Sequence, residues 1–330
     1  MKPLVSVIIP TYNRQQHIKN AVESVLGQTY KNVEVLVVDD GSTDSTPEIM
    51  NSIHDERLKY IRTKNQGNYF ARNAGLAQAK GDFIAFLDSD DRFLPTKLTV
   101  QIQRFEENPE LGLCCSNVYV RHQDIDNQVF EDAAHSFNCD IDTQNGFIQK
   151  AVENNFIVTS SVVIRKECVK NLGYFNTQFQ NAMDYEFFLR IIFNYPALYL
   201  KEKLLVRLIH PRAVSSNTVV TNDALVYIFS ECVAKLEKGK MYSQIHRELL
   251  NDAKEKSLYM SGMEYLLQYR FDDAIVYLKK TEFRKKIFFK HIALVIAKYK
   301  ISILIPLIAQ YRKYKNYSSL HRNPVVRSDI

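Results

Sequence analysis

Short apolar runs alternate with amphipathic helical patterns over the first 90 residues, and this alternation limits the possible folds more than any other feature. The runs at 5–9, 33–38, 58–62 and 82–87 have the length and the β-branched content of buried strands. Between the first two, apolar residues recur at helical spacing until Gly27, a residue typical of helix ends. Strands that are apolar on both faces and alternate with helices form a parallel sheet covered on both sides. We therefore expect an α/β fold with a mostly parallel, Rossmann-like sheet flanked by helices.

Strand signals continue to about residue 215 and then give way to helical patterns. Three further strands and one helix are predicted, at 113–120, 160–165, 204–209 and 183–193. The stretch 215–222 is polar and marks a boundary between the two kinds of pattern. We predict a first domain of residues 1–220 and a helical C-terminal region of residues 221–330.

The positive charge of the chain is concentrated near its C-terminal end. Residues 281–315 contain nine Lys or Arg and one Glu, a net charge of +8, whereas the whole chain carries +6. Within them, 283–315 combines the basic residues with large apolar side chains, a composition typical of segments that lie in a membrane interface beside anionic lipid. We expect a peripheral membrane contact there. The alternative is a terminal helix pair that packs on the protein with its cations solvated.

The expected location is the cytoplasm, at the inner face of the cell membrane. The five cysteines are odd in number and form no CxxC pair, which favours a reducing compartment. The first residues lack the pattern of a signal peptide, and no uncharged apolar run approaches the roughly 20 residues that span a bilayer. The aromatic residues are not interleaved with a basic groove, so we expect no nucleic-acid partner.

Polar clusters follow three strands of the predicted sheet: "PTYN" at 10–13, "DDGS" at 39–42 and "DSDD" at 88–91. Ligands of open parallel sheets bind outside the carboxyl ends of the strands, so these clusters should converge on one site. The sequence contains neither GxGxxG nor GxxxxGK[ST], which removes the main support for a dinucleotide-binding or P-loop protein.

The third cluster crowds three carboxylates into four positions. Hard cations such as Mg²⁺ and Mn²⁺ take oxygen ligands, and Mg²⁺ sites usually combine one or two carboxylates with substrate phosphates. Asp88 and Asp90 could share one such ion, whose charge would offset their repulsion. The alternative is that the cluster only caps the following helix, with Pro95 in the first turn of that helix.

Five stretches, in this order, resemble the family 2 glycosyltransferases with the GT-A fold. They are "VSVIIPTYNR" (5–14), "SVLGQTY" (24–30), "EVLVVDDGSTDST" (34–46), "NQGNYFARNAGLAQAKGDFIAFLDSDD" (65–91) and "NLGYFNTQF…MDYEFFLR" (171–190). The resemblance covers roughly the first 215 residues. It implies that residues of about 1–110 bind a nucleotide sugar and residues of about 111–220 bind the acceptor.

The resemblance also implies a nucleoside-diphosphate-sugar donor, usually UDP-linked, and a divalent metal, Mn²⁺ or Mg²⁺. The residues that it assigns to the donor are Pro10, Thr11, Tyr12, Asp39, Asp40, Arg72, Asn73, Asp88 and Ser89. Among them, Arg72 is a permanent cation that suits a diphosphate. The metal ligand is Asp90, with Asp88 and His210 close to the ion, and Asp91 is left to cap the following helix.

By the same resemblance, Asp184 is the catalytic base of an inverting transfer. A positioned carboxylate can take the proton from an acceptor hydroxyl as it attacks the anomeric carbon. Many family members have Glu-Asp at this point, whereas this chain has Met183 before Asp184. Glu186 is the alternative base if the register differs.

The expected acceptor is a saccharide or a lipid-linked saccharide used in the synthesis of cell-surface polysaccharide. Two other functions stay open at this level. A nucleotidyltransferase could use a similar sheet and acidic metal site, although its Gly- and Lys-rich triphosphate loop is absent after the first strand. A non-catalytic protein that binds sugar nucleotides or acts as a scaffold would not need Asp88, Asp90 and Asp184.

Overall fold

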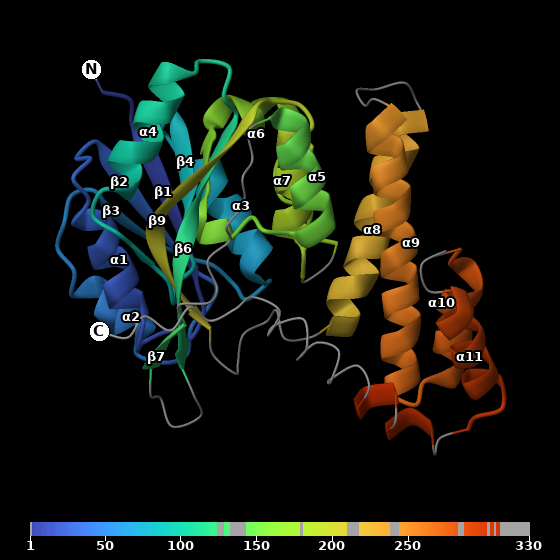
Figure 1. The fold of residues 1–330 in the computed structure, drawn as a ribbon. Coiled ribbons are helices and arrows are strands. Elements are labelled where there is room, and N and C mark those ends of the chain that lie inside the picture. The colour runs from blue at the N-terminus through green and yellow to red at the C-terminus, as the bar shows by residue number, and fades with distance from the viewer. Residues whose placement is uncertain are drawn as a thin grey trace, which may run out of the picture. The chain divides into compact units, whose positions relative to one another are not determined.

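The structure is a computed structural model, and it describes residues 2–123, 129–132, 143–178, 181–209, 218–237, 244–282, 287–301, 304–306 and 308–310. The chain divides into two compact units (Figure 1). Unit 1 comprises residues 1–216 and 238–246, and unit 2 comprises residues 217–237 and 247–330.

Unit 1 is built on a twisted sheet. Its described strands are β1 (Val5–Thr11), β2 (Val33–Asp39), β3 (Leu58–Arg62), β4 (Phe83–Phe86), β5 (Arg92–Phe93), β6 (Leu113–Gln123), β7 (Val129–Asp132), β8 (Val163–Arg165) and β9 (Ala197–Ile209). They run in the order β3-β2-β1-β4-β8-β6-β9-β5, and β7 pairs with β6. The first four strands of this order are mutually parallel, whereas β8 is antiparallel to both of its neighbours. The predicted fold class is confirmed: the first 90 residues supply four neighbouring parallel strands, and β6 and β9 form a further parallel pair.

Helices cover both faces of this sheet. They are α1 (Ile18–Leu26), α2 (Thr46–Asn51), α3 (Asn68–Gln78), α4 (Lys97–Glu107), α5 (Gln144–Asn154), α6 (Lys166–Leu172) and α7 (Met183–Ile192). On one face, α1, α2 and α4 pack against alternate side chains of β1, β2 and β4. On the other, α3 lies so close to β1 that a Cβ on Gly75 would come within 2.5 Å of a methyl carbon of Ile8. Phe86 of β4 meets the rings of Phe187 and Phe188 of α7 on this second face.

Two predicted strands begin several residues away from the expected position. The strand expected at 160–165 begins only at Val163, because residues Thr159–Ser161 form a 3-10 turn, η1. The strand expected at 204–209 begins at Ala197, since its whole length pairs with β6. Both differences concern segments whose partners lie far away in the sequence.

Unit 2 is helical, as predicted for the C-terminal region. It contains α8 (Thr218–Glu237), α10 (Phe271–Lys280), α11 (Ile287–Lys298) and most of α9 (Gln244–Leu267). Its core includes Leu266, Leu278 and Ile296, from three different helices. Within the described parts of the chain, no helix is both long enough and apolar enough to cross a membrane.

Candidate functional site

The loops that follow β1 and β2 are joined by hydrogen bonds. Thr11 lies opposite Asp39 in the register of the two strands, so the predicted polar clusters meet at one edge of the sheet. The Asn13 backbone N–H donates to Ser42 Oγ at 2.9 Å, and the Thr43 N–H donates to Asn13 Oδ1 at 2.8 Å. These hydrogen bonds fix the relative position of the two loops.

Asp39 and Asp40 are both buried and hold the surrounding backbone. Asp39 accepts hydrogen bonds from the Ser42 N–H at 2.8 Å and from the Tyr60 hydroxyl. Asp40 accepts from the backbone N–H groups of Gln66 and Gly67, at 2.9 and 2.7 Å. Burial and the bond to Asp39 raise the pKa of Tyr60, which keeps this hydroxyl a donor. The predicted contact of Asp40 with a nucleotide base stays a prediction.

The residues at the end of β1 that are predicted to bind the sugar donor differ in their exposure to solvent. Pro10 is buried, and Tyr12 is exposed at the start of the loop. Thr11 is only 3% exposed, and its Oγ1 has no hydrogen-bond partner within the described structure. A buried hydroxyl without a partner is costly, which makes Thr11 a candidate for a ligand contact. Ser89, in the acidic cluster after β4, is buried.

Arg72 forms an ion pair with Asp88. The distance between Arg72 Nη2 and Asp88 Oδ1 is 2.5 Å, and the arginine side chain is only 4% exposed. Its guanidinium lies 5.3 Å from the ring centre of Tyr69 and 5.9 Å from that of Phe175. Burial raises the pKa of Asp88 against the opposing effect of Arg72, and the neighbouring Asp90 adds to the rise. Arg72 therefore contacts the acidic cluster, and its predicted contact with a diphosphate stays a prediction.

Asp91 does not cap the following helix, contrary to the prediction. The helix α4 starts at Lys97, and the short strand β5 lies between the two. Asp91 is instead buried, and its Oδ1 accepts a hydrogen bond at 2.9 Å from the backbone N–H of Leu208 in β9. Burial and the adjacent carboxylates raise the pKa of Asp91 well above its usual range.

Asp184, the predicted base, lies in the first turn of α7. Its Oδ1 accepts a hydrogen bond from the Tyr69 hydroxyl at 3.3 Å, and its Oδ2 accepts one from Thr159 Oγ1 at 2.6 Å. Because the Tyr69 ring also contacts the guanidinium that pairs with Asp88, the structure brings Asp184 and the acidic cluster together. Asp184 and Asp88 come from elements almost 100 positions apart in the sequence.

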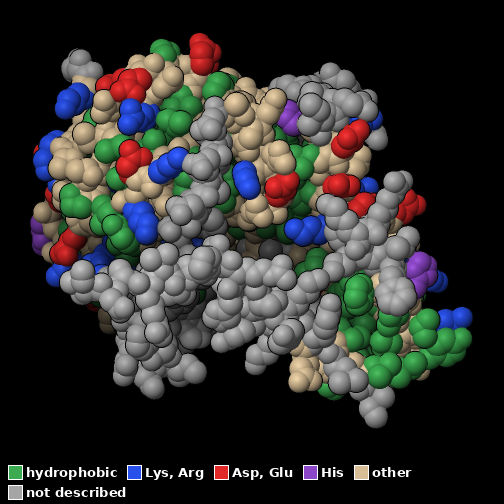
Figure 2. Space-filling view, viewed as in Figure 1, with side chains coloured by type: hydrophobic (Ala, Val, Ile, Leu, Met, Phe, Trp, Pro, Cys, Tyr) green, Lys and Arg blue, Asp and Glu red, His purple; other side chains and the backbone are tan. Residues whose placement is uncertain are grey.

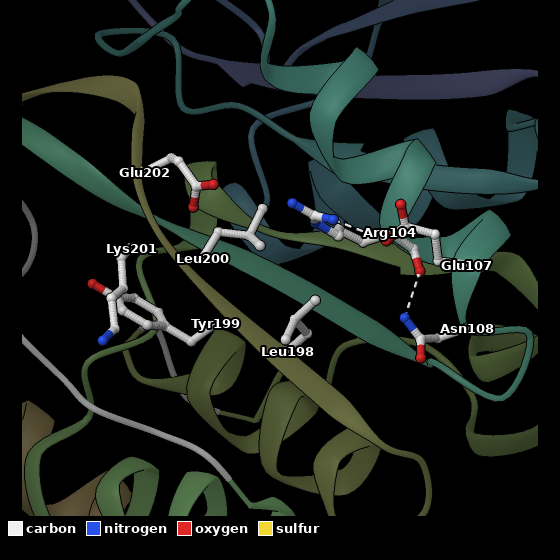
Figure 3. Close-up of a pocket in the computed structure, with 8 residues that line it drawn as sticks. All are labelled: Arg104, Glu107, Asn108, Leu198, Tyr199, Leu200, Lys201 and Glu202. Atoms are coloured by element: carbon white, nitrogen blue, oxygen red, sulfur yellow. Dashed lines mark hydrogen bonds and ion pairs between the residues drawn. The ribbon is translucent and has the colours of Figure 1, made fainter.

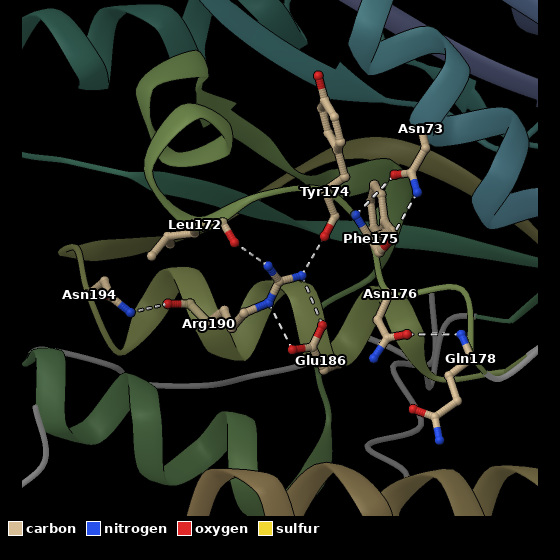
Figure 4. Close-up of polar contacts among 9 residues, drawn as sticks. All are labelled: Asn73, Leu172, Tyr174, Phe175, Asn176, Gln178, Glu186, Arg190 and Asn194. Carbon is tan, nitrogen blue, oxygen red and sulfur yellow. Dashed lines mark hydrogen bonds and ion pairs between the residues drawn. The ribbon is translucent and has the colours of Figure 1, made fainter. Parts of the chain in front are cut away.

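Glu186 and Asn73 have well-defined structural partners (Figure 4). Glu186 Oε1 lies 2.8 Å from Arg190 Nε, and the same arginine donates to the carbonyls of Leu172 and Tyr174. The amide of Asn73 forms two hydrogen bonds with the backbone of Phe175, at 2.9 and 3.0 Å. Glu186 is thus less suited than Asp184 to act as a base, and a donor contact of Asn73 stays a prediction.

The residues at the acidic cluster fit a divalent cation. His210 lies outside the described residues, and among those described no three His, Cys, Asp or Glu side chains are arranged to hold a metal ion by themselves. Asp88 and Asp90 are both partly exposed, and they supply the oxygen ligands that Mg²⁺ and Mn²⁺ prefer. Such ions commonly complete their coordination with substrate phosphates and water, so two carboxylates are sufficient from the protein.

A shallow groove of about 690 Å³ lies away from this cluster (Figure 3). It is lined by residues of α4 and of the first part of β9, among them Arg104, Glu107 and Leu200. None of the predicted site residues lines it.

Three residues of the cluster were not anticipated from the sequence: Tyr69, Thr159 and Ser160. Ser160 Oγ accepts a hydrogen bond from the Asp88 N–H at 3.0 Å, and Thr159 contacts Asp184. The turn η1 therefore contacts both the acidic cluster and the predicted base. The polar residues 159–161 lie directly before the apolar run 162–164, and this change in polarity is the signal in the sequence that could have indicated a turn.

Solved structures share this fold. The structure of residues 1–349 of S. aureus TarS, in complex with UDP-GlcNAc, superposes with a TM-score of 0.66 at 19% identity, covering 94% of this chain and 92% of that one. The mannosyltransferase PcManGT from Pyrobaculum calidifontis, in complex with GDP-Man and Mn²⁺, gives 0.60 at 18% identity, covering 97% and 85%. The fold is therefore that of the GT-A glycosyltransferases, as the resemblance implied.

The sequence profile described as glycosyl transferase family 2 matches residues 6–173, and the chain belongs to this family. The E. coli protein named UDP-Glc:alpha-D-GlcNAc-diphosphoundecaprenol beta-1,3-glucosyltransferase WfaP is 36% identical over 190 residues, which are 57% of this chain and 70% of WfaP. An uncharacterized glycosyltransferase of Rickettsia felis is 50% identical over 105 residues. That match covers 32% of this chain and only 17% of the Rickettsia protein.

Proposed function

We propose that this chain is an inverting, divalent-metal-dependent glycosyltransferase that uses a nucleoside-diphosphate sugar. The observation that carries the proposal is the convergence of Asp184 with Asp88, whose partners Tyr69 and Arg72 contact each other, at the carboxyl edge of the parallel strands. Membership of the family supports the reaction type. In this proposal residues 1–110 bind the donor, residues 111–220 bind the acceptor, and residues 221–330 form a separate helical region.

Asp184 accepts the proton of the acceptor hydroxyl as that hydroxyl attacks the anomeric carbon. The attack comes from the face opposite the leaving nucleoside diphosphate, so the configuration inverts. A carboxylate positioned beside the hydroxyl is a common general base for such a transfer. Mn²⁺ or Mg²⁺, when bound by Asp88 and Asp90, would stabilise the negative charge that develops on the diphosphate. His210 is proposed as a further residue near the ion.

UDP is the proposed nucleotide of the donor. WfaP is named for UDP-Glc, and TarS was solved with UDP-GlcNAc, whereas PcManGT holds GDP-Man. The identity to WfaP is 36% over 190 residues, against 18% for PcManGT, which favours uridine over guanosine. Thr11, Tyr12 and Asp40 are proposed to line the nucleoside pocket, and the partnerless hydroxyl of Thr11 supports this.

The proposed acceptor is a saccharide on a lipid diphosphate. WfaP is named for an acceptor of this kind. An enzyme with such an acceptor works at a membrane surface, and unit 2 offers a suitable face. Exposed apolar residues gather on unit 2 (Figure 2) and include Val276, Phe289, Ile292, Val295 and Tyr299. The exposed cations beside them are Lys279, Lys280, Lys298 and Lys300.

This face is proposed as a peripheral contact with anionic lipid on the cytoplasmic side of the membrane. Replacing both Ile292 and Val295 by Glu should reduce cosedimentation with phosphatidylglycerol vesicles. Tyr119→Glu, which alters an exposed apolar residue of unit 1, serves as the control. Equal binding by the wild type and the double variant would exclude this face.

The transferase proposal is tested by release of nucleoside diphosphate. The protein is incubated with Mn²⁺, with UDP-glucose, UDP-N-acetylglucosamine or GDP-mannose, and with an alkyl-diphosphate-linked N-acetylglucosamine. We expect UDP release that stops with EDTA, with Asp90→Ala and with Asp184→Asn. A nucleotidyltransferase would release pyrophosphate from a nucleoside triphosphate instead, and a scaffold would bind without release. Absence of turnover with every donor, or full activity of Asp90→Ala, would refute the proposal.

A further inference from the structure

Asp184 is held by two side-chain hydroxyls that come from different parts of unit 1. The Tyr69 hydroxyl of α3 and Oγ1 of Thr159 in η1 lie 3.3 and 2.6 Å from separate oxygens of the carboxylate. Tyr69 and Thr159 are both about 6% exposed, so water does not compete strongly for these contacts. The base is therefore fixed by buried groups, although Asp184 itself is partly exposed.

The direction of the tyrosine hydrogen bond is determined by its surroundings. The backbone N–H of Met183 points at the Tyr69 hydroxyl oxygen from 3.2 Å and can only donate. The hydroxyl proton must then go to the other neighbour, Oδ1 of Asp184. Burial and the nearby carboxylate of Asp184 raise the pKa of Tyr69, so the hydroxyl keeps its proton at any physiological pH.

The two carboxylate oxygens are not equivalent. Oδ1 accepts two hydrogen bonds, from the Tyr69 hydroxyl and, at 2.9 Å, from the backbone N–H of Tyr185. Each carboxylate oxygen offers about two acceptor positions, so Oδ1 has none left. Among the described residues, Oδ2 accepts one hydrogen bond, from Thr159, which leaves one position for a further donor.

We infer that Tyr69 and Thr159 are positioning residues that orient Asp184 so that Oδ2 takes the proton of the acceptor. The inference rests on the proposed role of Asp184 as the base. The same groups tie the base to the donor side, because the Tyr69 ring supports the guanidinium that pairs with Asp88. Ser160, next to Thr159, accepts from the Asp88 N–H.

The test compares variants that remove one hydroxyl and preserve the shape of the side chain. Tyr69→Phe and Thr159→Val should each lower kcat about 10- to 100-fold, since a hydrogen bond to a charged group contributes about 1.5–3 kcal/mol. The dissociation constant of UDP with Mn²⁺ should stay within about twofold of the wild type, because neither hydroxyl belongs to the donor contacts. Thr159→Ser keeps the hydroxyl and should restore most of the activity.

Tyr265→Phe is the matched control, because the hydroxyl of Tyr265 donates to Asp223 in unit 2. This variant should turn over like the wild type. If Asp184→Asn is inactive while Tyr69→Phe and Thr159→Val keep wild-type kcat, the positioning inference fails and the proposed function stands. If Asp184→Asn is as active as the wild type, the proposed base itself is wrong.

A crystal structure of the double variant Tyr69→Phe, Thr159→Val gives a readout that does not need turnover. We expect the Asp184 side chain to leave its wild-type rotamer, since the backbone N–H of Tyr185 would be the one donor to its carboxylate that is left among the described residues. An unchanged rotamer, with Oδ2 in the same place, would overturn the inference whatever the activity of the wild type.

Discussion

Lys97, at the start of α4, is a buried lysine whose ammonium has no carboxylate partner within the described structure. Its Nζ donates to Oε1 of Gln101 at 2.5 Å and lies 4.3 Å from the ring centre of Phe93. Burial lowers the pKa of Lys97 from 10.5 to about 7. Because burial of the charged form is unfavourable, Lys97 should destabilise the fold at neutral pH.

The size and the sign of this effect follow from proton binding. Between pH 7 and pH 10.5 the unfolded chain carries one more proton at Lys97 than the folded chain, so the free energy of unfolding rises with pH across this window. A difference of about 3.5 pKa units corresponds to about 5 kcal/mol, all of it unfavourable at or below pH 7. Above pH 10.5 the penalty is gone, since the lysine is neutral in both states.

Replacing Lys97 by Met should therefore stabilise the protein at pH 7. Methionine fills the space of the lysine stem, but Gln101 Oε1 loses its donor, which costs about 1–3 kcal/mol. We expect a net gain of about 2–4 kcal/mol at pH 7. At pH 10 most of the lysine penalty has disappeared, so the variant should be equal to the wild type or slightly less stable.

The measurement is urea unfolding followed by circular dichroism at pH 7 and pH 10, with m-values compared to check that the unfolded states match. Lys59→Met is the matched control, because Lys59 donates to Gln78 on the surface at 2.7 Å. Its effect should stay within about 0.5 kcal/mol at both pH values. A Lys97→Met variant that is less stable at pH 7, or equally stabilised at both pH values, would refute the argument.

Three further substitutions probe the site and its support. Thr11→Val removes a buried hydroxyl that has no partner within the described structure, so stability should hold while the affinity for UDP, measured by calorimetry, falls about 2- to 10-fold. Gly75→Ala should lower the free energy of unfolding by about 1–3 kcal/mol, because the new methyl group overlaps Ile8. Asp91→Ala leaves the Leu208 N–H without its acceptor and should destabilise by about 1–3 kcal/mol, whereas Asp91→Asn keeps an acceptor and should lose less. Denaturant unfolding checks the last two.

The parallel half of the sheet and the meeting of its polar strand ends were predictable from the sequence. The strands β1, β2 and β4 are buried almost entirely on both faces, so each is a mostly apolar run in the sequence. Parallel strands place their carboxyl ends at one edge, and the pairing of Thr11 with Asp39 follows directly from this rule. Local sequence was sufficient here, because the apolar composition of each strand indicates its burial even when its partner strand is not known.

The supports of Asp184 were not predictable in this way. Tyr69 is 115 positions from Asp184 in the sequence, and Asp91 is 117 positions from Leu208. The sequence predicts Asp91 as a helix cap, because an acidic residue shortly before a helix often caps it. In the structure β5 occupies the intervening residues and pairs with β9, which moves the helix start to Lys97 and brings Asp91 against β9.

The carboxylates around the site are held by different kinds of partner, and the difference explains why Asp184 suits proton transfer. Asp88 and Glu186 each form an ion pair with a guanidinium, at 2.5 and 2.8 Å. A guanidinium in contact with a carboxylate occupies acceptor positions that an incoming hydroxyl would otherwise use. Asp184 is held by two neutral hydroxyls and one backbone N–H, which fix its orientation without supplying a full positive charge. The fold thus pairs two guanidinium groups with Asp88 and Glu186, and it orients the proposed base with neutral donors.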